Sequence, residues 1–258
     1  MPTIAEKQAW NYQWAKFKDD SLFLFKEWIY PYTLDFFKGK TVLDLGCGGG
    51  QHAGFLASYA KKVVGIDMST AELAREHNKQ FTNTEFITGD IATITLDEQF
   101  DAVYCIGVIQ HTENPDKTFA RIKTFVKPGG TLIVWCYSKE GNWPQLFILE
   151  PLKKLFLLRL SGKTLEYLSF VLTTLLYLPV YTIYLLPLQF LPYYQYFQNF
   201  RLLSFGRNNL NVFDKLNAPR TNFISRAQIN SWFNEREFSN IHIGWYRGVS
   251  YRASGTKR

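Results

Sequence analysis

Cysteine is scarce in this sequence, and a secretion signal is not apparent. The 258 residues contain only Cys47, Cys105 and Cys136, which lie far apart, and an odd count cannot pair completely within one chain. Two of the three lie in apolar runs that are typical of strands. Residues 1–14 contain no apolar run of the signal-peptide type. These absences favour reduced thiols and a cytoplasmic location.

Acidic residues are scarce in the second part of the chain. Residues 1–140 hold 15 Lys or Arg and 17 Asp or Glu, whereas residues 141–258 hold 14 and 5, so the formal charge of +7 arises from the second part. This asymmetry favours an anionic small molecule, a nucleic acid or an anionic membrane surface as a partner, although a solvated basic face explains it equally well. No His, Cys, Asp or Glu residues have metal-ligand spacing, so we expect no metal site.

Charge is absent from residues 167–200, where 11 of 34 residues are Phe or Tyr. About 20 apolar residues suffice to span a bilayer, but Pro179, Pro187 and Pro192 argue against a span. The alternatives are a buried lid, an oligomer interface, or peripheral membrane contact through residues 143–206. The sequence predicts no oligomeric state.

Strand-like and helix-like patterns alternate in the first part of the chain. Short apolar runs predict strands, and apolar residues at helical spacing predict helices between them; the strands are 41–45, 63–67, 85–89, 100–106 and 131–137, and the helices 51–60, 71–79 and 115–126. Residues 127–130 are predicted to form a turn. Such alternation predicts parallel βαβ units. Further on, Ser225 is expected to cap a helix to about Asn234, and closing strands are expected at 241–243 and 249–252.

A glycine-rich loop follows the first predicted strand. Gly46, Gly48, Gly49 and Gly50 stand where that strand turns into a helix, and glycine permits positive φ angles and close approach of a ligand to the backbone. The N-terminal end of the next helix suits a carboxylate or a phosphate. Alone, this loop is also compatible with a tight turn that binds nothing.

Two aspartates end the next two predicted strands. Asp67 follows Val63-Val64-Gly65-Ile66, where a carboxylate can accept both hydroxyl hydrogens of a ribose. Asp90 follows Phe86-Ile87-Thr88-Gly89, where a carboxylate can accept a hydrogen bond from an adenine amino group. Surface or capping roles explain either aspartate alone, but explain both less well.

Taken in order, these motifs resemble the class I S-adenosylmethionine-dependent methyltransferases that act on small molecules, lipids and sugars. The resemblance covers about residues 41–136 through Asp44–Gly50, Gly65–Ser69, Gly89–Ile91, Phe100–Val103 and Val126–Leu132. It implies a three-layer αβα Rossmann-like fold, with a mostly parallel seven-stranded sheet, an antiparallel last strand and a helical apolar insertion. A dinucleotide-binding fold is disfavoured because Gln51, rather than Gly or Ala, stands three residues after Gly48.

The resemblance also implies the residues that bind S-adenosylmethionine and its product S-adenosylhomocysteine. The glycines would line the methionine part, Asp67 would hold the ribose, Asp90 with Ile91 would read the adenine, and Met68 with Ile91 would sandwich the purine. The full set is Asp44, Gly46, Cys47, Gly48, Gln51, Asp67, Met68, Asp90, Ile91, Ile106 and Gly107.

His111 is the candidate catalytic residue. It follows the fourth predicted strand, whose carboxyl end should lie near the reacting methyl group. A neutral imidazole suits a general base for a hydroxyl acceptor. The segment resembles the family's His-His or Glu-His pair, with Gln110 in the first position, so only His111 is available there as a base. A packing or loop-bonding role for His111 is the alternative, because many such enzymes act by proximity alone.

We expect a single domain, 1–258, that methylates a small or lipid-like acceptor, either neutral or anionic, with oxygen as the favoured atom. Its parts are N-terminal helices (1–40) at one edge, a cofactor-binding half (41–140), a helical insertion or lid (143–211) and a closing helix and strands (212–258). A nucleic-acid methyltransferase is disfavoured because no Pro-Pro-Tyr motif or dense basic run is present. A non-catalytic adenosylmethionine-binding subunit is the third alternative. Tyr246, Arg247 and Arg252 either line the acceptor pocket or are exposed strand residues.

Overall fold

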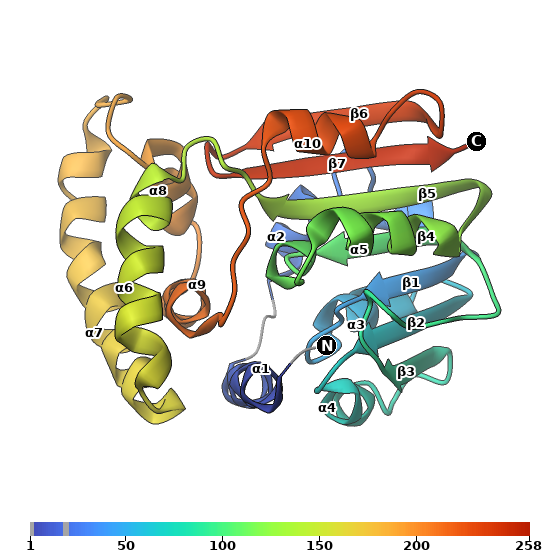
Figure 1. The fold of residues 1–258 in the computed structure, drawn as a ribbon, viewed down its shortest axis with the longest axis horizontal. Coiled ribbons are helices and arrows are strands. Elements are labelled where there is room, and N and C mark those ends of the chain that lie inside the picture. The colour runs from blue at the N-terminus through green and yellow to red at the C-terminus, as the bar shows by residue number, and fades with distance from the viewer. Residues whose placement is uncertain (1–2, 18–20) are drawn as a thin grey trace.

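One seven-stranded sheet organises the fold, with the strand order β3-β2-β1-β4-β5-β7-β6 (Figure 1). The computed structural model describes residues 3–17 and 21–258. The last strand, β7, runs antiparallel to both of its neighbours, and the other six strands point the same way, so the predicted sheet is confirmed. The strands are β1 (Thr41–Leu45), β2 (Lys62–Asp67), β3 (Thr84–Thr88), β4 (Phe100–Ile106), β5 (Val126–Tyr137), β6 (Phe238–Tyr246) and β7 (Ser250–Lys257).

Helices cover both faces of this sheet, because its central strands are apolar on both sides. Neighbouring residues of β4 illustrate this: Val103 belongs to one buried cluster and Tyr104 to another, as the two-residue period of a strand requires. The first cluster includes residues of α5 (Pro115–Ile122) and α10 (Arg226–Trp232), and the second includes residues of α2 (Leu22–Trp28), α3 (Gln51–Ala57) and α4 (Ala71–His77). Short 3₁₀ turns at Leu34–Phe37, Ile109–His111 and Lys123–Phe125 complete this part.

Two local features differ from the sequence-based expectation. Residues 127–130, predicted as a turn, lie within β5, where they bulge between the pairs Phe100–Val126 and Ala102–Thr131. Gly129 adopts a φ of 77°, which a bulged backbone tolerates best at glycine. The closing strands are also longer than predicted, because polar or small residues interrupt the apolar pattern: exposed Asn240 and His242 in β6, and buried Ser254 and Gly255 in β7.

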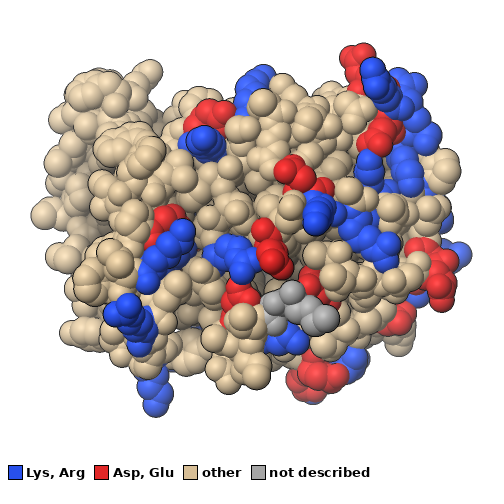
Figure 2. Space-filling model, viewed as in Figure 1, with Lys and Arg blue, Asp and Glu red and all other residues tan. Residues whose placement is uncertain are grey.

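The predicted insertion forms a helical block beyond the carboxyl ends of the parallel strands, whose arrowheads point toward it in Figure 1. It contains a π-helical turn (Gln145–Leu149), α6 (Glu150–Leu155), a 3₁₀ turn (Leu157–Arg159), α7 (Gly162–Val180), another 3₁₀ turn (Ile183–Leu185), α8 (Tyr194–Phe200) and α9 (Phe205–Asn217). In Figure 2 the upper left part of this end of the molecule shows no charged side chains, whereas Lys or Arg side chains lie on its lower left part. None of the helices in residues 3–17 and 21–258 combines the length and apolar character needed to cross a membrane.

The first helix, α1 (Ile4–Lys16), is anchored to the last helix of the insertion. The amide of Gln13 donates to Asp214 at 2.9 Å, the amide of Asn217 donates to the Ala9 carbonyl at 3.0 Å, and the ring of Phe17 packs 4.9 Å from that of Phe213. These contacts hold α1 near the carboxyl edge of the sheet, where Glu6, Trp10 and Trp14 lie beside residues that follow β1, β2 and β4.

Candidate active site

The glycine loop after β1 depends on two glycines that no other residue can replace. Gly46 and Gly48 adopt φ angles of 80° and 54°, in the left-handed region that favours glycine. A Cβ atom added to Gly46 would overlap the side chain of Val108, and one added to Gly48 would lie 2.7 Å from the Trp14 ring. The two glycines therefore allow Val108 and Trp14 to pack directly against the loop backbone, and Gly46 also lines the cavity.

Asp67, at the end of β2, braces this loop. One carboxylate oxygen accepts a hydrogen bond from the backbone N–H of Gly48 at 3.1 Å. The other oxygen accepts from the N–H groups of Ser69 and Thr70, at 3.0 and 3.1 Å. The Ser69 hydroxyl also donates to this second oxygen, at 3.4 Å. The oxygen bonded to Gly48 accepts only one of the four hydrogen bonds and keeps acceptor capacity, and Asp67 lines the cavity. Asp67 thus fixes the loop while remaining able to bind a hydroxyl group.

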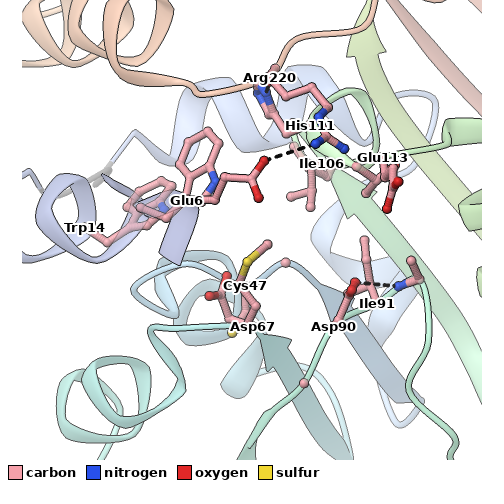
Figure 3. Close-up of a pocket in the computed structure, with 18 of the residues that line it drawn as sticks. Glu6, Trp14, Cys47, Asp67, Asp90, Ile91, Ile106, His111, Glu113 and Arg220 are labelled. Atoms are coloured by element: carbon pink, nitrogen blue, oxygen red, sulfur yellow. Dashed lines mark hydrogen bonds and ion pairs between the residues drawn. The ribbon is translucent and has the colours of Figure 1, made fainter. Parts of the chain in front are cut away.

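Asp90 lies across the same cavity from the glycine loop (Figure 3). Its Oδ1 accepts from the N–H of Ala92 at 2.9 Å, which folds the chain back after β3. Ile91 is buried against the core, and Met68, after β2, also lines the cavity. The order of the strands β3, β2 and β1 thus brings the two aspartates to neighbouring strand ends of one edge, as the sequence predicts.

The loop after β4 places His111 on the opposite side of the cavity. The His111 Nδ1 atom lies 2.7 Å from the carbonyl oxygen of Arg220, and because a carbonyl only accepts, Nδ1 carries the proton. The unprotonated nitrogen is therefore Nε2, with the amide of Gln110 at 3.4 Å. Burial has the largest effect on the pKa of His111 and lowers it, although the negative charge of nearby Asp214 acts to raise it. The ring is thus neutral at pH 7, with a lone pair on Nε2.

The cavity is covered by α1 and by the segment before α10, not by the insertion. Glu6, Trp10 and Trp14 follow one another at four-residue spacing on one face of α1, and all three line the cavity (Figure 3). Arg220 lines it from the other side and reaches Glu6 at 3.4 Å. No residue of 143–211 lines this cavity.

Most of the predicted cofactor residues meet in this cavity. Its lining includes Gly46, Cys47, Gln51, Asp67, Met68, Asp90, Ile91, Ile106, Gly107 and His111. Two predicted residues, Asp44 and Gly48, do not line it. Asp44 is 1% exposed behind the loop, where burial raises the pKa of its carboxyl group to about 8, although Tyr104 opposes the shift. Gly48 instead contacts Asp67 and Trp14.

The residues that cover the cavity are not among those that the sequence motifs predict. Trp10, Trp14 and Arg220 lie far from the motifs along the chain, and their position depends on how α1 packs against α9. The only signal available was the spacing of Glu6, Trp10 and Trp14, which predicts one helical face rich in aromatic rings.

A second, larger cavity lies beneath the insertion. Its volume is 430 Å³, compared with 170 Å³ for the first, and it shares no lining residue with the first. Apolar side chains from α2, β5, α7, α8 and α9 form most of its wall, and Tyr246 and Arg247 also reach it. Arg252 does not line it and instead donates to the Glu27 carbonyl at 2.9 Å.

The chain is similar to known methyltransferases in the sequence of one segment and in its fold. Residues 43–134 match the protein family described as "Methyltransferase domain". Residues 43–134 therefore form a methyltransferase domain. This agrees with the resemblance seen in the sequence and with the fold of the seven-stranded sheet.

Among curated proteins, the ubiquinone biosynthesis O-methyltransferase of Coxiella burnetii (strain Dugway 5J108-111) is 37% identical over 99 residues. The match covers 37% of this chain and 42% of that enzyme, so the chain spans less than half the length of this relative. Among solved structures, a protein of Pyrococcus horikoshii OT3 matches 94% of this chain and 95% of its own at a TM-score of 0.54 and 20% identity. The N-methyltransferase NodS of Bradyrhizobium japonicum WM9, solved with S-adenosyl-L-homocysteine, matches 98% of both chains at a TM-score of 0.52 and 12% identity. These two structures support the fold.

Proposed function

We propose that this chain is an S-adenosylmethionine-dependent methyltransferase that methylates an oxygen atom of a small, lipid-like acceptor. The observation that carries the proposal is the meeting of the glycine loop, Asp67 and Asp90 in one cavity within a methyltransferase domain. The name of the Coxiella burnetii relative supports oxygen as the acceptor atom and a small molecule as the acceptor.

The residues in the cavity fit the cofactor. The Asp67 oxygen that accepts only from Gly48 retains capacity for a ribose hydroxyl hydrogen, and Asp90 offers a carboxylate beside the apolar Ile91, as an adenine would require. The buried Nε2 of Gln51 lines the cavity and makes no hydrogen bond within the part of the chain that the structure describes. An amide donor of this kind would suit the carboxylate of the methionine part, since a buried donor without a partner is costly.

The remaining residues suit transfer to a hydroxyl group. S-adenosylmethionine supplies a methyl group already activated on a sulfonium, so the protein has to align the acceptor and remove one proton. His111 is neutral and directs its hydrogen at Nδ1 to the Arg220 carbonyl. Its Nε2 accepts from the Gln110 amide only at the long distance of 3.4 Å, and it takes the acceptor's proton when the acceptor hydroxyl displaces that weak hydrogen bond and the new oxygen–carbon bond forms. The tryptophans of α1 and the ion pair between Glu6 and Arg220 exclude water from the covered side.

Calorimetry with S-adenosylmethionine and S-adenosylhomocysteine tests the cofactor assignment. We expect binding to the unmodified chain and a loss of at least 100-fold in affinity for Asp67→Ala. The exposed Asp97→Ala is the matched control and should change the affinity by less than twofold. Absence of binding to both compounds would overturn the proposal, whereas tight binding without turnover of any hydroxylated acceptor would favour a non-catalytic subunit.

A further inference from the structure

The second cavity has the size and lining of a ligand site rather than of a packing defect. Its 430 Å³ falls within the range of small-molecule pockets, which are mostly apolar and carry a few placed polar groups. The walls come from the insertion on one side and from β5 and α2 on the other. The first cavity is therefore not the only hollow at the carboxyl edge of the sheet.

Only side chains separate the second cavity from the first. Trp28 lines the second cavity, and its ring lies 5.0 Å from Trp135 of the same wall and 5.8 Å from His52, which lines the first cavity. Further along the wall, Tyr137 of the second cavity lies 6.0 Å from the ring of His111. A molecule in the second cavity is thus one aromatic layer away from the proposed base.

The polar atoms of this wall lack protein partners. Trp135 Nε1, Gln145 Nε2 and Asn199 Oδ1 are buried without a hydrogen bond in residues 3–17 and 21–258, and Gln145 and Asn199 are only 4% and 7% exposed. Buried polar groups in folded proteins are almost always bonded, so such a group lining a cavity indicates a ligand atom or water that completes the bond. Three such atoms in one apolar cavity favour a ligand with a polar, oxygen-bearing head.

Charge in the same lining is of one sign. Lys215 and Arg247 reach the cavity, and no Asp or Glu lines it. The Lys215 ammonium lies 5.4 Å over the Tyr137 ring, and is 3.4 Å from the hydroxyl of Tyr196, to which it donates. A cationic ligand would be repelled here, whereas a neutral or anionic head is stabilised.

We infer that the cavity beneath the insertion binds the methyl acceptor, and that this acceptor is a neutral or anionic lipophilic molecule with an oxygen-bearing head. This inference rests on the proposed function. The apolar body lies among the leucines and aromatic rings of α7 and α8, and the head lies at the Trp28, Trp135 and Tyr137 layer, on the side nearest His111. The insertion therefore determines which acceptor is used, and α1 covers the cofactor.

Two neighbouring leucines of α7 give a matched test. Leu176 lines the cavity, whereas Leu175 is 64% exposed on the outer side of the same helix. Leu176→Trp fills the cavity, and Leu175→Trp adds the same side chain outside it. The probes are decanoate and the cationic decyltrimethylammonium, measured by calorimetry on the full chain below their micelle-forming concentrations, with S-adenosylhomocysteine measured in parallel and thermal melting to check folding.

We expect decanoate to bind the unmodified chain at least tenfold more tightly than decyltrimethylammonium. Leu176→Trp should weaken decanoate at least tenfold and leave S-adenosylhomocysteine within twofold, and Leu175→Trp should change neither. Equal binding of both probes, or equal effects of the two variants, would overturn the inference while S-adenosylhomocysteine still binds. If Leu176→Trp does not fold, Leu176→Ala enlarges the cavity instead, and unchanged decanoate affinity there also overturns it. Loss of S-adenosylhomocysteine binding in the unmodified chain would instead defeat the proposed function.

Discussion

The cofactor-binding half and the insertion meet at one edge of the sheet but are built in opposite ways. In residues 41–140 the cavity is formed by glycine backbone and short acidic side chains at strand ends. In residues 143–211 the cavity is formed by large apolar side chains, and the outer surface is apolar as well. Phe147, Tyr167, Leu178 and Phe190 are each more than 70% exposed. The comparison suggests that the chain binds its cofactor through fixed backbone geometry and its acceptor through a surface whose shape depends on helix packing.

The largest expected effect comes from disturbing the backbone of the cofactor-binding half. Gly46→Ala places a Cβ against Val108 at a φ of 80°, so we expect at least a 100-fold loss of affinity for S-adenosylhomocysteine and a lower melting temperature. Gly129→Ala is the matched control, because Gly129 has a similar φ of 77° with nothing within 4 Å of the added atom. It should cost stability without affecting cofactor affinity. Equal affinity losses in the two variants would show that strain alone, rather than the loop's close packing, explains the result.

The sequence predicts the cofactor-binding half well because local rules determine it. Strand ends in a parallel sheet meet at one edge, so glycines, Asp67 and Asp90 can be placed from their order in the chain alone. Alternating strand and helix patterns likewise predict the parallel strands. Ser225 caps α10 as expected, accepting a hydrogen bond from the N–H of Gln228. These elements needed no knowledge of distant contacts.

The sequence predicts the cover and the second cavity poorly because tertiary packing determines them. The position of α1 depends on Gln13 and Phe17 contacting α9, about 200 residues later in the chain. The wall between the cavities likewise joins Trp28 to Trp135, which no local pattern connects. The bulge at residues 127–130 also depends on tertiary pairing. The composition of these residues predicts a turn, but pairing with β4 on both sides of Gly129 keeps them within the strand.

His111 offers an intermediate test, at the point where the two regions meet. Its folded pKa lies below the value of an unperturbed histidine, so the unfolded chain takes up a proton first as pH falls, and stability is lost on acidification below about pH 6.5. His111→Gln should reduce this loss, seen as a smaller drop in melting temperature between pH 7 and pH 5. In turnover with a hydroxylated acceptor the same variant should fall by at least 100-fold at unchanged S-adenosylhomocysteine affinity. A turnover change within twofold would reduce His111 to a packing role.

The smallest expected effect comes from the ion pair that fastens the cover. Glu6 and Arg220 lie 3.4 Å apart with 16% and 41% of their side chains exposed, and exposed pairs contribute about 1 kcal/mol or less. Glu6→Gln should therefore speed dissociation of S-adenosylhomocysteine by about two- to fivefold. The difference in rate between the variant and the unmodified chain should become smaller at high salt, because salt screens the ion pair in the unmodified chain. Glu72→Gln removes a comparable exposed pair with Arg75 on α4, away from the cavity, and should leave the rate unchanged. If Glu6→Gln and the unmodified chain release S-adenosylhomocysteine at the same rate at low salt, the contacts of α1 with α9 alone hold α1 over the cofactor. The insertion would then position both the acceptor and the helix that covers the cofactor.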